Sequence, residues 1–177
     1  YTHAFKFAEE TKKYLEGGLG LVGVALFYFY DSLICISLIT DKNKLEKNKY
    51  LMRVNRNQSK LKKISRSSPN NHLHKYLLVE AEKMRILQKY EKAMIYYDDS
   101  IKSAKDNNYL NELALANELA AKFYLQNKKF PFAKAYILDS FDCYKRWGAT
   151  SKVLALEKYY GNFFNNLSIF AQDHQST

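Results

Sequence analysis

Four glutamates occupy predicted helices in which paired carboxylates could do acid–base chemistry: Glu80, Glu82, Glu112 and Glu118. General acid–base catalysis needs such groups within reach of a reacting group, beside a nucleophile, a metal or a phosphate site. The sequence places no such partner beside these acids. We therefore expect Glu80 and Glu118 to be semi-buried carboxylates that bond to neighbouring helices, with Lys75 or Lys122 as partners, and we expect no catalytic residue in the chain.

Histidines and glycines give two further candidate sites. His72 and His74 are two residues apart, a spacing that does not share a helix face, and there is neither an HExxH motif nor a Cys–His cluster. Residues 18–23 spell GxGxxG, but a dinucleotide site needs a strand before that motif, and a helix is expected there. We expect His74 to cap or pack a helix, the glycines to link two helices, and no metal or cofactor.

Most of the net charge of +10 lies in residues 42–66, where ten lysines and arginines accompany a single acid, Glu46. The basic patch of this segment consists of Lys60, Lys62, Lys63 and Arg66. Such a segment could bind phosphates, but Tyr50 is its only aromatic residue, which argues against stacking on single-stranded bases. We expect a solvated face or a contact with an acidic neighbouring domain, with nucleic acid or anionic lipid as the alternative.

The elements that position these residues are predicted to be helices, because glycine (6) and proline (2) are scarce and 47% of residues are apolar. Apolar periodicity and stop signals predict about eight helices, at 4–16, 19–40, 43–64, 72–88, 90–106, 110–127, 131–146 and 150–160. A loop is expected at 65–71, where Pro69 breaks the chain and Asn70 or Asn71 caps the next helix. We expect one domain, 1–164, and a frayed tail, 165–177. Because the chain begins at Tyr1, we expect a piece of something longer.

The most apolar stretch, residues 19–40, contains Asp31 near its middle. A charge at that depth of a membrane costs about 3 kcal/mol on insertion scales, and lysines flank both ends. We therefore expect a buried core helix, no membrane span and a cytoplasmic protein. Cys35 and Cys143 lie in apolar helical stretches, so we expect two reduced, buried thiols.

An internal repeat relates residues 72–106 to residues 110–146. Alignment at an offset of 40 residues matches small with small and large with large: Ala81 with Ala121, Met84 with Tyr124, Tyr90 with Phe130, Ala93 with Ala133 and Ser100 with Ser140. Two antiparallel helices need small residues where their backbones approach. The spacing is typical of tetratricopeptide (TPR) hairpins, whose usual period is about 34 residues. We predict an all-α fold of stacked antiparallel hairpins, a short TPR-like right-handed solenoid to which the flanking helices contribute.

In TPR hairpins the first helix lines a concave groove that can accept a peptide or a neighbouring domain. By repeat register, the predicted groove contains Lys75, Leu78, Glu82, Arg85, Glu118 and Lys122, with Ile86, Leu115, Leu125 and Gln126 beside them.

Several longer runs resemble one family: residues 27–33 (FYFYDSL), Asn57-Gln58, 69–82 (PNNHLHKYLLVEAE), 112–124 (ELALANELAAKFY) and 147–153 (WGATSKV). Together, over about residues 5–160, they resemble the helical region of very large multi-sensor kinases of cyanobacteria, some other bacteria and fungi. In that family a serine/threonine kinase-like domain, a predicted ATPase, this region, a GAF sensor and a histidine kinase follow one another. The resemblance implies context rather than chemistry, since the family's ATP sites and phosphorylated histidine lie in other domains.

The sequence thus predicts a non-catalytic adaptor that mediates contacts between the ATPase and the GAF and histidine kinase parts of a large signalling protein. Two alternatives remain open. One is a stand-alone TPR-like protein that binds a peptide segment of another protein, and the other is a basic helical protein that binds nucleic acid.

Overall fold

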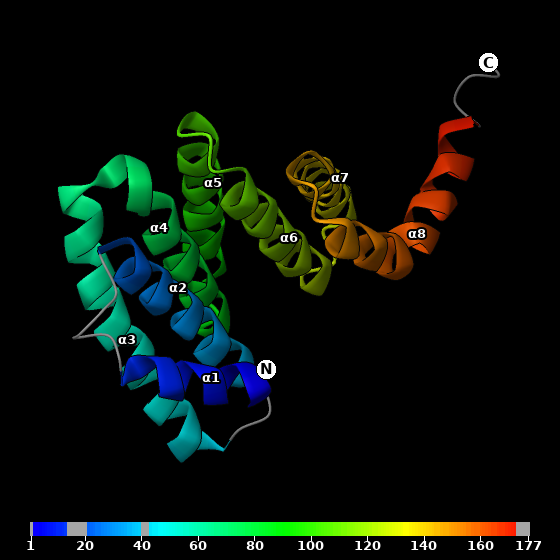
Figure 1. The fold of residues 1–177 in the computed structure, drawn as a ribbon. Helices are drawn as coiled ribbons and strands as arrows, with labels where there is room; N and C mark the ends of the chain where they lie inside the picture. The colour runs from blue at the N-terminus through cyan, green and yellow to red at the C-terminus, as the bar shows by residue number, and fades with distance from the viewer. Residues whose placement is uncertain (1, 14–20, 40–42, 173–177) are drawn as a thin grey trace. The chain divides into compact units, whose positions relative to one another are not determined.

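The computed structural model describes residues 2–13, 21–39 and 43–172, and within these ranges the chain forms eight α-helices and no strand (Figure 1). The helices are α1 (Thr2–Lys12), α2 (Leu21–Leu38), α3 (Lys44–Ser67), α4 (Pro69–Ile86), α5 (Tyr90–Asp106), α6 (Leu110–Gln126), α7 (Phe130–Trp147) and α8 (Thr150–Gln172). The all-helical prediction is confirmed. The glycines predicted to link the first two helices lie mostly at 17–20, outside the described residues.

Two predicted boundaries differ from the structure. The loop expected at 65–71 shrinks to Ser68, because proline at the first position of α4 lacks only an N–H that would have no helical partner there. Asn70 and Asn71 therefore lie inside α4 and do not cap it. The last helix continues to Gln172 instead of ending at 160, in line with the apolar residues that recur past Gly161 in the sequence. Of the predicted tail, residues 173–177 lie outside the described part.

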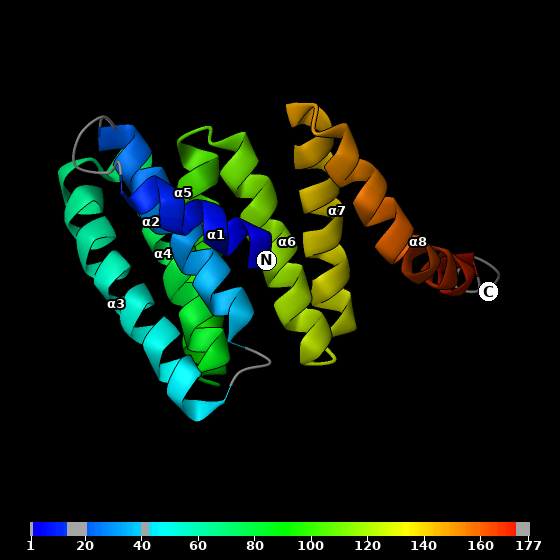
Figure 2. The same ribbon diagram turned by 60° about the horizontal axis from the view of Figure 1, so that its bottom comes forward.

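The contacts group the chain into two compact units, residues 1–107 and 108–177, which are described separately. In the first unit α2 packs against α3 and α4, α3 against α4, α4 against α5, and α1 lies across α2 (Figure 2). Its core includes Phe29 and Ile36 of α2, Leu61 of α3 and Val79 of α4. No helix in the described ranges, α2 included, combines the length and apolarity that a membrane crossing requires. The single domain over 1–164 stays a prediction.

In the second unit, α6 packs along α7 and α7 contacts α8. Tyr144 and Cys143 of α7, Ala114 of α6 and Leu156 of α8 form a buried cluster, and Val153 is among the partly buried residues around it. Each unit carries one cysteine, Cys35 in the first and Cys143 in the second. Both are buried thiols that form no disulfide, as predicted. Burial raises the pKa of the Cys35 thiol to about 12.

The hairpins α4–α5 and α6–α7 turn in the same way. After α4, Lys89 N donates to Met84 O (2.9 Å) and Gln88 N donates to Arg85 O (3.0 Å), while Gln88 has a left-handed φ of 58°. This is the Schellman pattern of helix termination. The same bonds recur 40 residues later: Lys129 N to Tyr124 O (2.9 Å) and Lys128 N to Leu125 O (3.0 Å), with φ 56° at Lys128. Gly148 is likewise left-handed at the end of α7.

The seam of each hairpin also repeats. Ala93 and Ala133 are fully buried where the helices approach. Ser100 Oγ donates to the backbone oxygen of His74 (2.8 Å), and Ser140 Oγ donates to that of Ala114 (2.9 Å). The 40-residue offset of the sequence is thus an offset of backbone geometry as well.

Candidate functional site

Most of the predicted groove is buried. Four of its side chains belong to residues that are nearly inaccessible: Leu78 (1% exposed), Lys75 (3%), Glu82 (5%) and Glu118 (7%). Arg85 and Lys122 keep 21% and 43% of their side-chain surface exposed. Arg85 in the first unit and Lys122 in the second are therefore the predicted groove residues that a partner could reach, while the other four act inside their own units. That a partner binds here stays a prediction.

Glu82 joins the two helices of the first hairpin. Tyr97, fully buried in α5, donates its hydroxyl to the Glu82 carboxylate, and Arg85 Nη2 lies 2.6 Å from Glu82 Oε2. Burial raises the pKa of Tyr97 well above its ordinary value, and the negative charge of Glu82 adds to the effect. The phenol therefore stays protonated and donates, as a structural contact requires.

Glu118 has the corresponding role in the second unit, with more cations around it. Its carboxylate accepts from Lys122 Nζ (2.6 Å) and Tyr144 Oη (2.7 Å), and from Lys152 Nζ of α8 (2.9 Å). Burial alone would raise the pKa of Glu118, but the charges and hydrogen bonds of these partners lower it to about 2. The predicted pairing with Lys122 is confirmed. Lys152 also ties α8 to α6, which no local spacing could indicate.

His74 and Lys75 form a buried pair in α4. Lys75 Nζ lies 2.8 Å from His74 Nε2 and donates to Asn71 O (3.1 Å), so the imidazole nitrogen accepts. Burial, followed by the charge of Lys75, lowers the pKa of His74 to about 3. His74 therefore packs as a neutral residue, one of the two roles predicted for it. Glu80 bonds instead to Gln58 Nε2 (2.8 Å) and Lys83 Nζ (3.1 Å).

Asp31 is the buried charge whose role the sequence did not indicate. It is 1% exposed and sits in α2, where Arg53 of α3 approaches both of its oxygens, with Nε 2.8 Å from Oδ2. Asn57 Nδ2 donates to Oδ2 as well (2.6 Å), and Arg53 also pairs with Glu9 of α1. The only sequence signal was an acid in an apolar helix. Its partner lies 22 residues away on another helix, beyond the reach of i, i+4 spacing.

The basic patch of α3 is exposed at Lys60, Lys62, Lys63 and Arg66. Lys60 differs from the others, because it also lines a hollow of about 240 Å³ formed by α1, α2 and α3. The lining residues are Lys12, Phe27, Tyr28, Asp31, Arg53, Arg56, Asn57 and Lys60. The structure thus divides the patch into one residue at a concave site and three on an open face.

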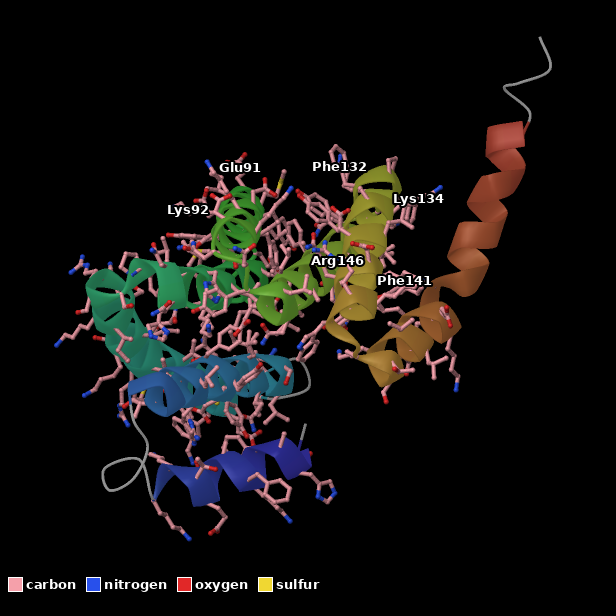
Figure 3. The ribbon with its side chains drawn as sticks, turned by 45° about the horizontal axis from the view of Figure 1, so that its top comes forward. Glu91, Lys92, Phe132, Lys134, Phe141 and Arg146 are labelled. Atoms are coloured by element: carbon pink, nitrogen blue, oxygen red, sulfur yellow. The ribbon has the colours of Figure 1, made fainter. Side chains whose placement is uncertain are left out.

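The outer helices of the two hairpins differ at one repeat position near their beginnings. Glu91 and Lys92 project from the beginning of α5, whereas Phe132, which corresponds to Lys92 in the repeat, projects from the beginning of α7 (Figure 3). Phe132 is 58% exposed and stacks against Tyr124 of α6, with ring centroids 5.5 Å apart. Large apolar residues are exposed on both outer helices: Tyr90, Met94 and Ile95 on α5, and Phe130, Leu138 and Trp147 on α7.

The described residues include no group of three or more histidine, cysteine or acidic side chains that could hold a metal ion. The sequence matches no protein-family model, and no solved structure matches it. Over 68 residues, 37% of the chain, it is 46% identical to hybrid signal transduction histidine kinase G of Dictyostelium discoideum. The matched part makes up 2% of that kinase. The chain therefore contains a segment related to part of a signal transduction kinase. The organism of that kinase lies outside the groups that the sequence resemblance indicated.

Proposed function

We propose that this chain is a non-catalytic, TPR-like adaptor segment of a large cytoplasmic signalling kinase. The observation that carries the proposal is the 46% identity over 68 residues to a hybrid histidine kinase. Because this stretch is 2% of that kinase, the remainder of such a protein could hold all its catalytic domains. The buried carboxylates Glu82 and Glu118 support a structural role, since their contacts join helices within the units.

The contacts of the adaptor are proposed to link an ATPase to GAF and histidine kinase domains. Arg85 and Lys122 offer exposed charge on the predicted groove, and α7 offers exposed aromatic surface. Exposed aromatic residues beside charges are typical of protein–protein interfaces. The same surfaces serve the second candidate, a stand-alone protein that binds a peptide of another protein.

A capture experiment tests the adaptor proposal. The chain is immobilised, and the ATPase fragment and the GAF–histidine kinase fragment of such a kinase are offered separately at low and moderate salt. Salt-resistant capture that weakens in Phe132→Ser or Arg85→Ala, but not in the control Lys102→Ala, is the expected result. Circular dichroism establishes that the variants keep their helices. Failure to capture either fragment would contradict the proposal, and salt-sensitive retention of nucleic acid would favour the basic-protein alternative.

A further inference from the structure

We propose that the hollow formed by α1, α2 and α3 is a binding site for a small phosphate-bearing anion, inorganic phosphate or a phosphomonoester. Four cations line it, Lys12 of α1 and Arg53, Arg56 and Lys60 of α3, together with one carboxylate, Asp31 of α2. The proposal is independent of the adaptor role, because it rests on the lining residues alone.

The single carboxylate that lines the hollow, Asp31, is already bonded within the wall. Both oxygens of Asp31 bond to Arg53, and Asn57 Nδ2 donates to Oδ2 at 2.6 Å. Glu9 pairs with the same arginine from outside the hollow. The charge of Asp31 is thus offset within the wall by Arg53, which two carboxylates hold in place, so the cations left for a ligand are Lys12, Arg56 and Lys60.

Three cations remain for a ligand. Lys12, Arg56 and Lys60 are exposed, and none of them forms an ion pair with a residue that the structure describes. Arg56 and Lys60 are four residues apart, so they share one face of α3, and Lys12 faces them from the end of α1. A guanidinium offers a phosphate two parallel donors, and an ammonium adds a compact charge.

The size of the hollow suits the phosphate group of a small ligand. Its volume of about 240 Å³ lies below the roughly 300–1,000 Å³ of sites that enclose drug-sized ligands. A phosphate group with a short substituent fits this space. The chemistry is shared by two sources, a free phosphate compound and a phosphorylated side chain of a partner.

The experiment is a calorimetric titration of the full chain at constant ionic strength with three probes: inorganic phosphate, a phosphoserine peptide and the same peptide without phosphate. Saturable binding of phosphate or of the phosphopeptide supports the site. A phosphopeptide that binds no more tightly than phosphate indicates a free ligand, and one that binds more tightly indicates a partner's side chain.

Matched variants separate the hollow from the general basic character of α3. Arg56→Gln with Lys60→Gln removes two lining cations and should weaken binding about tenfold or more, since charge-assisted bonds are lost. Lys62→Gln with Lys63→Gln removes the same charge from the open face and should change the affinity less than about twofold. Equal losses in the two double variants, or no saturable binding of either phosphate probe, would overturn the proposal. All four positions are exposed on α3, and circular dichroism verifies that the helices remain.

Discussion

The hairpins α4–α5 and α6–α7 have one backbone design and two different sets of buried charges. Their turns, their buried alanines and their serine-to-backbone bonds coincide at an offset of 40 residues. Yet His74 and Lys75 of the first hairpin correspond to Ala114 and Leu115 of the second. The hairpin geometry therefore does not depend on these charges.

The carboxylate–tyrosine bonds also indicate that the hairpin geometry does not depend on where a buried charge lies. Glu82 bonds to Tyr97 in the first hairpin and Glu118 to Tyr144 in the second, but Glu82 corresponds to Lys122 and Leu78 to Glu118 in the repeat. Each hairpin places its acid at a different turn of the first helix and supplies a tyrosine at the matching height. The two hairpins share only the requirement that a buried carboxylate has hydrogen-bond partners.

The largest predicted difference between the two hairpins is in how their stability responds to acid. The folded pKa of His74 is lowered from 6.5 to about 3, so the stability it contributes is present above pH 6.5 and is lost as the pH falls toward 3. The full loss is on the order of 5 kcal/mol. Native-state hydrogen exchange should show α4–α5 losing protection below pH 6.5, and His74→Gln should reduce this loss. Protection that is unchanged down to pH 4 would contradict the assignment of a neutral buried histidine.

In the second hairpin the predicted loss of stability begins at a lower pH. Because the pKa of Glu118 is lowered from 4.5 to about 2, its contribution is present above pH 4.5 and is lost as the pH falls toward 2. Glu118→Gln should cost about 3 kcal/mol at pH 7, measured by urea unfolding. The exposed Glu157 in α8 provides the control, and Glu157→Gln should stay within about 0.5 kcal/mol. Similar losses in both variants would show that the bonds of Glu118 are not what stabilises the unit.

Overpacking should affect both hairpins alike. Ala93→Leu and Ala133→Leu each insert a larger side chain at a fully buried seam and should cost about 1–3 kcal/mol. Ala135 lies in α7 two residues from Ala133 but is exposed, so Ala135→Leu should be nearly neutral in thermal unfolding. Tolerance of both seam variants would refute the repeat register.

The serine bonds should contribute equally in the two hairpins. Ser100→Ala and Ser140→Ala each remove a buried hydroxyl that donates to a backbone oxygen, at a cost of about 1 kcal/mol. Ser59→Ala on the exposed face of α3 is the control. A difference between the hairpins larger than about 1 kcal/mol would mean that their seams are not equivalent.

The smallest predicted effect is a gain in stability. Gln88→Gly and Lys128→Gly relieve a left-handed backbone in a residue with a side chain and should stabilise by about 0.5–1 kcal/mol each. Lys129 has a φ of −96°, so Lys129→Gly should instead destabilise slightly. Calorimetric melting temperatures distinguish the two signs.

Local patterns in the sequence predicted the helices well, because apolar periodicity and stop signals act within a few residues. The helix expected at 90–106 matches α5 (Tyr90–Asp106). The contacts of the charges were largely beyond prediction, because Asp31 with Arg53 and Glu118 with Tyr144 join residues more than 20 positions apart. The groove prediction assumed that the first helix of each hairpin keeps an open face, but α2, α3 and α5 all pack against α4 and bury Lys75 and Leu78.

The two cysteines give this chain a built-in pair of reporters. Each compact unit holds one buried thiol, Cys35 in the first and Cys143 in the second. A thiol reagent reacts with a thiolate that it can reach, so labelling must wait until the helices around each sulfur separate. The rate at which each cysteine is alkylated, read by mass spectrometry of its peptide, therefore measures how often that unit opens. A comparison of the alkylation rates of Cys35 and Cys143 therefore shows whether the two units open independently, and it needs no introduced label.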